Sequence, residues 1–205
     1  VEAEAIMNAR RITGLATALV LATGLATGVS PSVATAKHRI PDRCWPSYKH
    51  DLQRLQRRMN AQLPHYDAHY TSVNAMLDGM VDILSSDSQD LLPQMEAGAS
   101  EYRETMTPLI ADDRNSATKL VSVVQRSNKS CFNGKRQQKF LTGMAGVRSA
   151  FQDLFGAYGT TQLAAGYLTT AQTAKAQEAL NKAAVDSATV EDQFDQGIKA
   201  LRDLV

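Results

Sequence analysis

The sequence lacks the short motifs that mark most enzyme active sites. It contains no GxSxG nucleophile elbow, no P-loop, no dinucleotide-binding glycine pattern and no HExxH zinc motif. It has only two cysteines, Cys44 and Cys131, and these cannot build a cysteine-rich metal cluster. These absences lead us to expect a protein that is not an enzyme.

Patterns typical of β-strands are also nearly absent. No segment alternates β-branched or aromatic residues with polar ones between turn residues, and no repeat of about 34 or about 40 residues indicates a solenoid. Apolar residues instead recur at intervals of three and four, as they do in amphipathic helices. We therefore expect an all-α fold, an elongated antiparallel bundle of about five helices, some of them kinked at proline.

The bounds of the expected helices follow from their apolar stripes and from the residues that interrupt them. Pro64 is expected to end or kink the first helix, and Pro108 to kink or divide the third. Glycines within residues 156–159 are expected to end the fourth. The expected segments are residues 45–63, 66–84, 93–124, 140–155, 161–184 and 190–204, with a loop at 127–134.

The segment 7–36 has the three parts of an export signal. These parts are a positively charged start, an uncharged and largely apolar stretch, and a small-x-small site for signal peptidase. They correspond to Arg10 and Arg11, residues 12–29 and residues 34–36. Residues 1–6 include two glutamates, which do not suit a positive start, so we expect translation to begin at Met7.

Cleavage after Ala36 would leave one domain, residues 37–205, either secreted or held in the cell envelope. The alternative is an uncleaved membrane anchor, since about 18 uncharged residues is near the minimum for spanning a bilayer. An exported chain meets an oxidising compartment, so Cys44 and Cys131 are expected to form a disulfide that spans 87 positions (131 minus 44). A free, reactive thiol is the alternative.

Charges of one sign are grouped along the chain, although 22 basic and 21 acidic residues leave a formal net charge of +1. Residues 37–63 carry seven basic and two acidic side chains, residues 67–113 one basic and ten acidic, and residues 114–148 eight basic and no acidic. One interpretation is that neighbouring helices of opposite sign complement each other. The other is that the disulfide joins the two basic segments into a basic pole.

A basic pole attracts anions through its local field. The expected ligands are an anionic envelope polymer, a lipid headgroup or an acidic protein. Nucleic acid is not expected, because the chain has no recognisable binding motif and no overall basicity. The sequence thus predicts an exported, non-enzymatic binding or structural protein of the cell envelope or extracellular space. Its candidate anion-binding residues are Arg39, Arg43, Lys49, Lys129, Lys135 and Arg136.

His65 and His69 carry the alternative prediction, a carrier that binds a transition metal or haem. A spacing of four places both imidazoles on one helix face, where they can supply two ligands to one metal ion. Tyr66 and Tyr70 stand beside them, and tyrosine and histidine both ligate haem iron. No third metal ligand follows from the sequence, so the competing interpretation is a pair of polar residues at the start of a helix.

Overall fold

The computed structural model describes residue 41 and residues 43–205. Within this part of the chain the regular structure is helical and no strand occurs, which confirms the all-α prediction. The α-helices are α2 (Trp45–Leu84), α3 (Leu92–Asn128), α4 (Gly134–Leu168), α5 (Thr173–Ser187) and α6 (Val190–Arg202), and the 3₁₀ helices are η1 (Gln89–Leu91) and η2 (Lys129–Cys131).

The predicted export signal, with its start at Met7 and its cleavage after Ala36, lies outside the described residues, as does Arg39. No helix among the residues that the structure describes has both the length and the apolarity needed to cross a bilayer.

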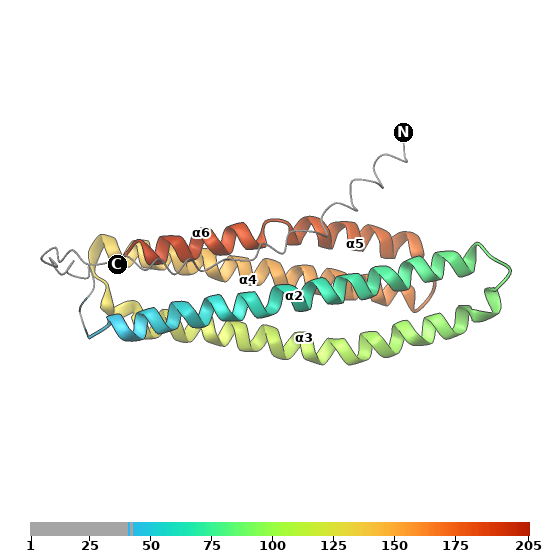
Figure 1. Cartoon of the computed structure of the whole chain (residues 1–205), viewed down its shortest axis with the longest axis horizontal. Coiled ribbons are helices and arrows are strands. Elements are labelled where there is room, and N and C mark those ends of the chain that lie inside the picture. The colour runs from blue at the N-terminus through green and yellow to red at the C-terminus, as the bar shows by residue number, and fades with distance from the viewer. Residues whose placement is uncertain (1–40, 42) are drawn as a thin grey trace, which may run out of the picture. The chain divides into compact units, whose positions relative to one another are not determined.

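The described helices form an antiparallel bundle (Figure 1). Three long helices, α2, α3 and α4, lie side by side, and α5 and α6 follow one another along a fourth row. Helix α4 contacts all four of the others. Where the sequence predicted about five helices, the bundle has three helices of 35 to 40 residues and two short ones of 15 and 13 residues.

Both internal prolines lie within continuous helices. Pro64 is inside α2 and Pro108 is inside α3, so neither divides its helix. Both rings are exposed, and a proline on the solvent side removes a backbone hydrogen bond where the helix can curve around the core. Burial continues on either side of Pro64, at Met59 and Tyr66, and this packing outweighs the local cost of proline.

The predicted end of the fourth helix at residues 156–159 is wrong. Helix α4 continues to Leu168, so residues 161–168 belong to α4 and the fifth helix starts only at Thr173. Gly156 and Gly159 are exposed, whereas Ala157 and Tyr158 between them are buried in the core. Packing of the buried face thus holds the helix through two residues of low helix propensity.

The left-handed position at the end of α4 is not occupied by glycine, so the sequence did not predict where this helix ends. Ala171 adopts the left-handed conformation with φ of 52°. The Gln172 amide donates to the Tyr167 carbonyl at 3.0 Å, and the Ala171 amide donates to the Leu168 carbonyl at 3.3 Å. These two bonds are those of a Schellman motif, in which glycine is the usual left-handed residue.

Helices α4 and α6 approach so closely that their crossing requires glycine. A Cβ atom added to Gly197 would lie 2.9 Å from the backbone nitrogen of Val147 and 3.2 Å from the carbonyl oxygen of Gly143. A Cβ atom added to Gly143 would lie 2.9 Å from two side-chain carbons of Leu201. The short helix α6 is therefore positioned on α4 by direct backbone contact.

The glycines of α4 allow a test of its continuity. A Cβ atom at Gly156 or Gly159 would meet nothing within 4 Å. We expect Gly156→Ala and Gly159→Ala each to raise the free energy of unfolding by about 0.5–1 kcal/mol in urea titrations, because alanine loses less backbone entropy in a helix. Gly197→Ala is the matched control and should lower it by about 1–3 kcal/mol through overpacking. Destabilisation at both exposed positions would contradict a continuous α4.

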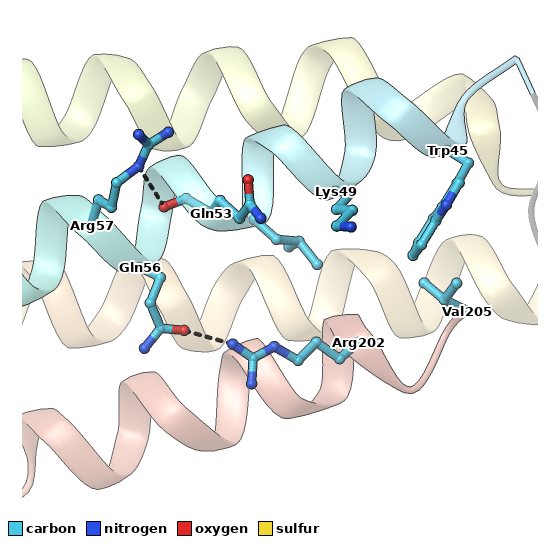
Figure 2. Close-up of a pocket in the computed structure, with 8 residues that line it drawn as sticks. Trp45, Lys49, Gln53, Gln56, Arg57, Arg202 and Val205 are labelled. Carbon is cyan, nitrogen blue, oxygen red and sulfur yellow. Dashed lines mark hydrogen bonds between the residues drawn. The ribbon is translucent and has the colours of Figure 1, made fainter. Parts of the chain in front are cut away.

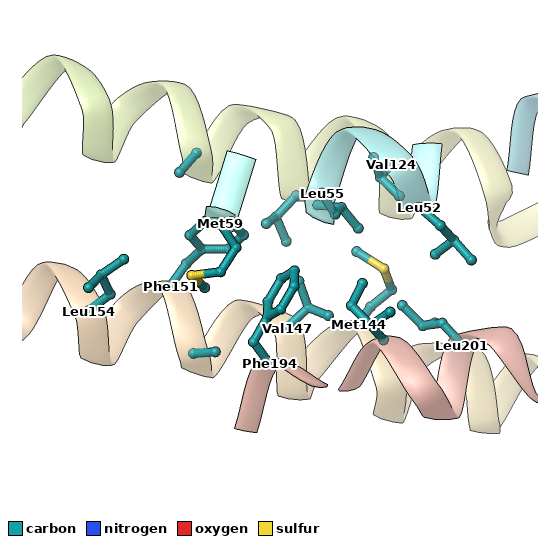
Figure 3. Close-up of a cluster of buried hydrophobic side chains, with 14 of the residues drawn as sticks. Leu52, Leu55, Met59, Val124, Met144, Val147, Phe151, Leu154, Phe194 and Leu201 are labelled. Atoms are coloured by element: carbon teal, nitrogen blue, oxygen red, sulfur yellow. The ribbon is translucent and has the colours of Figure 1, made fainter. Parts of the chain in front are cut away.

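The core has two parts with different side chains. The part nearer the disulfide contains large residues from α2, α3, α4 and α6 (Figure 3), among them Leu52, Leu55, Met59, Val124, Met144, Val147, Phe151, Leu154, Phe194 and Leu201. The other part combines Val73, Leu77 and Met80 of α2 with mostly alanine from α4 and α5. On α2, His69 lies between Tyr66 of the first part and Val73 of the second.

Candidate functional site

The register between α2 and α3 decides which charges become neighbours. Three contacts define this antiparallel pairing. The Asn128 side-chain amide donates to Asp51 at 2.7 Å, the Arg58 guanidinium donates to Asp113 at 2.6 Å, and the His69 Nδ1 lies 2.9 Å from the Tyr102 hydroxyl oxygen.

This register places the basic first half of α2 beside the basic second half of α3, and the acidic half of each beside that of the other. Opposite charges meet across this helix pair at Arg58 and Asp113, as the complementary interpretation expects, but otherwise segments of like sign lie beside each other.

The disulfide closes the basic side of the bundle. Cys44 and Cys131 are bonded, with Cα atoms 6.0 Å apart, as the sequence predicted. Next to the bond, Tyr48 packs edge-on against Phe132 at 5.2 Å between ring centroids, and Phe132 stacks on Phe140 at 4.8 Å. The start of α2, the end of α3 and the start of α4 are thus held together at one end.

The predicted anion-binding residues in the described region all lie at this end and are exposed: Arg43, Lys49, Lys129, Lys135 and Arg136. Arg54 pairs with Asp51, Arg58 with Asp113 and Lys182 with Asp186, and Arg43, Lys49, Lys129 and Lys135 take no part in these three ion pairs.

Four further exposed cations lie at the same end but were not predicted: Arg126, Lys139, Lys199 and Arg202. Lys199 and Arg202 come from α6, and only the packing of that helix on α4 brings them here. The Tyr48 hydroxyl donates to the Leu201 carbonyl at 2.7 Å, and the Arg202 guanidinium donates to Gln56 at 2.8 Å. We call the nine exposed cations the basic end: Arg43, Lys49, Arg126, Lys129, Lys135, Arg136, Lys139, Lys199 and Arg202.

The carboxylate of Asp51 lies near the basic end, but it is nearly buried and accepts hydrogen bonds from other side chains of the protein. It accepts hydrogen bonds from Asn128 at 2.7 Å, from the Ser127 hydroxyl at 3.1 Å and from Arg54 at 3.3 Å. A buried carboxylate needs such partners to compensate for its lost hydration. Asp51 thus ties α2 to α3, whereas Asp203 is exposed next to Arg202 at this end.

A groove of about 510 Å³ lies on the flank of the basic end, between α2 and α6. Figure 2 shows Trp45 and Val205 near one end and Arg57 near the other, with the hydrogen bond from Arg202 to Gln56 joining the two helices. The lining residues are Trp45, Lys49, Leu52, Gln53, Gln56, Arg57, Arg202 and Val205. Three of them are cations and none is an aspartate or glutamate.

The two predicted metal ligands lie in different environments. His65 is exposed, whereas His69 is 1% exposed and is stacked between Tyr102 and Tyr158, with centroid distances of 5.6 and 5.7 Å. The structure therefore does not bring the two imidazoles together at one accessible point. The described residues contain no group of three or more His, Cys, Asp or Glu side chains placed to hold a metal ion.

The tyrosines beside the histidines also take part in packing. The Tyr66 hydroxyl donates to the Ala183 carbonyl at 3.1 Å, and burial raises the pKa of Tyr66. Tyr70 is half-buried and lies 6.3 Å from the Tyr66 ring. Burial also lowers the pKa of His69 to about 4, so this imidazole is neutral at ordinary pH.

Of the site residues, the basic ones near the disulfide were predicted, whereas the groove between α2 and α6 was not. The groove depends on where α6 lies, and no local pattern in the sequence indicates that. Comparison with known proteins adds no relative, because no family model, curated protein or solved structure matches this chain.

Proposed function

We propose that this chain is an exported, non-enzymatic binding protein of the cell envelope or extracellular space that engages anionic ligands through its basic end. The observation that carries the proposal is the register of α2 and α3, joined by the Cys44–Cys131 bond. This register brings together cations that are separated by more than 80 positions in the sequence. Residues 67–113, with ten acidic side chains and one basic, occupy the other half of both helices.

The three ligand classes that suit the basic end are an anionic envelope polymer, a lipid headgroup layer and an acidic protein surface. All present several negative charges in an array. A basic residue held near an anionic membrane surface contributes about 1 kcal/mol, so several of them acting together give useful affinity. Because the cations are exposed, this attraction is screened by salt. We therefore expect binding that is multivalent and salt-sensitive, without a deep pocket for one molecule.

Binding to lipid vesicles tests the proposal. Vesicles of phosphatidylcholine with phosphatidylglycerol should bind the chain at low salt and release it at high salt, whereas pure phosphatidylcholine vesicles should bind weakly at both. The variant Lys129→Glu/Lys135→Glu/Arg136→Glu should bind the anionic vesicles at least about 100-fold more weakly. Losing three attractive contacts of about 1 kcal/mol each accounts for that factor, and the added glutamates are also repelled. Unchanged binding of this variant at low salt would refute the proposal.

A further inference from the structure

We infer that the groove between α2 and α6 is a binding site for a single-chain amphiphile with an anionic head. Its lining contains two distinct kinds of surface. Trp45, Leu52 and Val205 supply apolar contact, and Lys49, Arg57 and Arg202 supply positive charge. Lys49 and Arg202 also belong to the basic end, but neither is among the three cations reversed above, so the groove experiment and the vesicle experiment can fail separately.

The size of the groove argues against a simple inorganic anion. A volume of about 510 Å³ is within the range of small-molecule sites, which run from about 300 to about 1,000 Å³. Such sites are mainly apolar and use a few polar groups to orient the ligand. Trp45 and Val205 lie near one end of the groove (Figure 2), and with the nearly buried Leu52 they form the apolar surface that suits an alkyl chain.

The charge of the groove argues against a neutral or cationic ligand. Lys49, Arg57 and Arg202 are exposed, and no acidic side chain stands among the lining residues. Arg202 already donates to Gln56 at 2.8 Å, but a guanidinium has five N–H donors, so others remain for a ligand. Hydrogen bonds from these cations to a carboxylate or phosphate are the strong, charge-assisted kind. Gln53 and Gln56 add neutral polar groups beside them.

Trp45 is the only tryptophan in the chain, and it lines the groove, so its fluorescence reports occupancy. We expect octanoate and octyl phosphate, added to the purified chain below their micellar concentrations, to change this fluorescence with saturation. 1-Octanol supplies the alkyl chain without a negative charge, and sodium sulfate supplies negative charge without an alkyl chain. Neither should give the same saturable change at equal concentration.

Two variants locate the site. Lys49→Gln/Arg202→Gln should weaken octanoate binding at least about tenfold, because two charge-assisted contacts are lost. Lys119→Gln removes an exposed cation that belongs neither to the groove nor to the basic end, and it should bind octanoate as the wild type does. Circular dichroism of each variant should show unchanged helix content, because all three side chains are exposed.

Three outcomes would overturn the inference: no saturable change with octanoate, an equal response to 1-octanol, or equal binding by wild type and Lys49→Gln/Arg202→Gln. A response to sulfate alone would also overturn it, since that result indicates general attraction by the basic end. In each case the vesicle measurement above remains an independent test of the proposed function, because it depends on Lys129, Lys135 and Arg136.

Discussion

The double variant Cys44→Ala/Cys131→Ala is expected to lose about 2–4 kcal/mol in its free energy of unfolding, the usual effect of removing a disulfide. The bond joins residues 87 positions apart, and a chain-entropy model gives about 4–5 kcal/mol for a loop of that length. The main cause is that the bond restricts the unfolded chain. In the folded state the bond fixes Cys44, the N-cap residue of α2, to Cys131 at the end of η2.

Urea titration at fixed pH measures this loss, and a reducing agent provides the control. Reductant should destabilise the wild type by a similar amount, and it should leave the double variant unchanged because that variant has no sulfur bond to reduce. We expect a larger loss at low salt, since the bond holds Arg43 near the cations that follow α3, such as Lys129 and Lys135. A loss below about 1 kcal/mol would contradict a structural role for the bond.

Acidification is expected to destabilise the bundle through His69, by about 2 kcal/mol between about pH 7.5 and about pH 5. Burial lowers the pKa of His69 to about 4, against 6.5 in the unfolded chain. Between these values the unfolded chain binds a proton that the folded protein excludes. Stability is therefore complete above about pH 6.5 and falls as the pH is lowered toward about 4.

His69→Phe should remove most of this pH dependence, because phenylalanine can occupy the space between Tyr102 and Tyr158 without titrating. His65→Gln is the control and should keep it, since His65 is exposed. Burial raises the pKa of Asp67, which opposes the effect at lower pH, but that contribution cancels in the comparison with His69→Phe. The measurement is urea titration across the pH range, and equal slopes for wild type and His69→Phe would exclude His69 as the cause.

Local patterns predicted the helical segments well where a buried stripe dominates. The last expected helix, residues 190–204, agrees closely with α6 (Val190–Arg202) because Phe194, Ile198 and Leu201 are all buried. The prediction failed at Gly156 and Gly159 because their effect depends on which face they occupy. Because both glycines are on the exposed face, their only effect is a lower helix propensity. The packing of the buried Tyr158 keeps α4 continuous.

The sequence does indicate that His65 is exposed and His69 is buried, although the four-residue spacing alone does not. His69 is three residues after Tyr66 and four before Val73, which places it within the apolar stripe of α2, and it is buried with them. His65 precedes Tyr66 and lies off that stripe, in solvent. A four-residue spacing predicts a shared face, but the position of the stripe decides which member of the pair is accessible.

The basic end was predictable in part because one covalent bond sets its geometry. Joining Cys44 to Cys131 must bring their flanking cations together, whatever the rest of the fold. Arg202 and Lys199 could not be added in this way, because their place depends on the close contact of Gly197 with α4. The groove beside Trp45 needed the same information, so it was found only in the folded structure.

The central claim is that the location of the cations, and not the net charge of the chain, gives affinity for anions. Two triple variants of equal net charge test it. One is Lys129→Glu/Lys135→Glu/Arg136→Glu at the basic end. The other is Arg103→Glu/Lys175→Glu/Lys182→Glu, which reverses three exposed cations of the other half, on α3 and α5.

The measurement is the dissociation constant of each variant for anionic phosphatidylglycerol vesicles at one low salt concentration. We expect the basic-end variant to bind at least about 100-fold more weakly than the wild type, and the other variant to stay within about tenfold of it. Equal affinities of the two variants would contradict the claim, because they would show that net charge alone controls the binding.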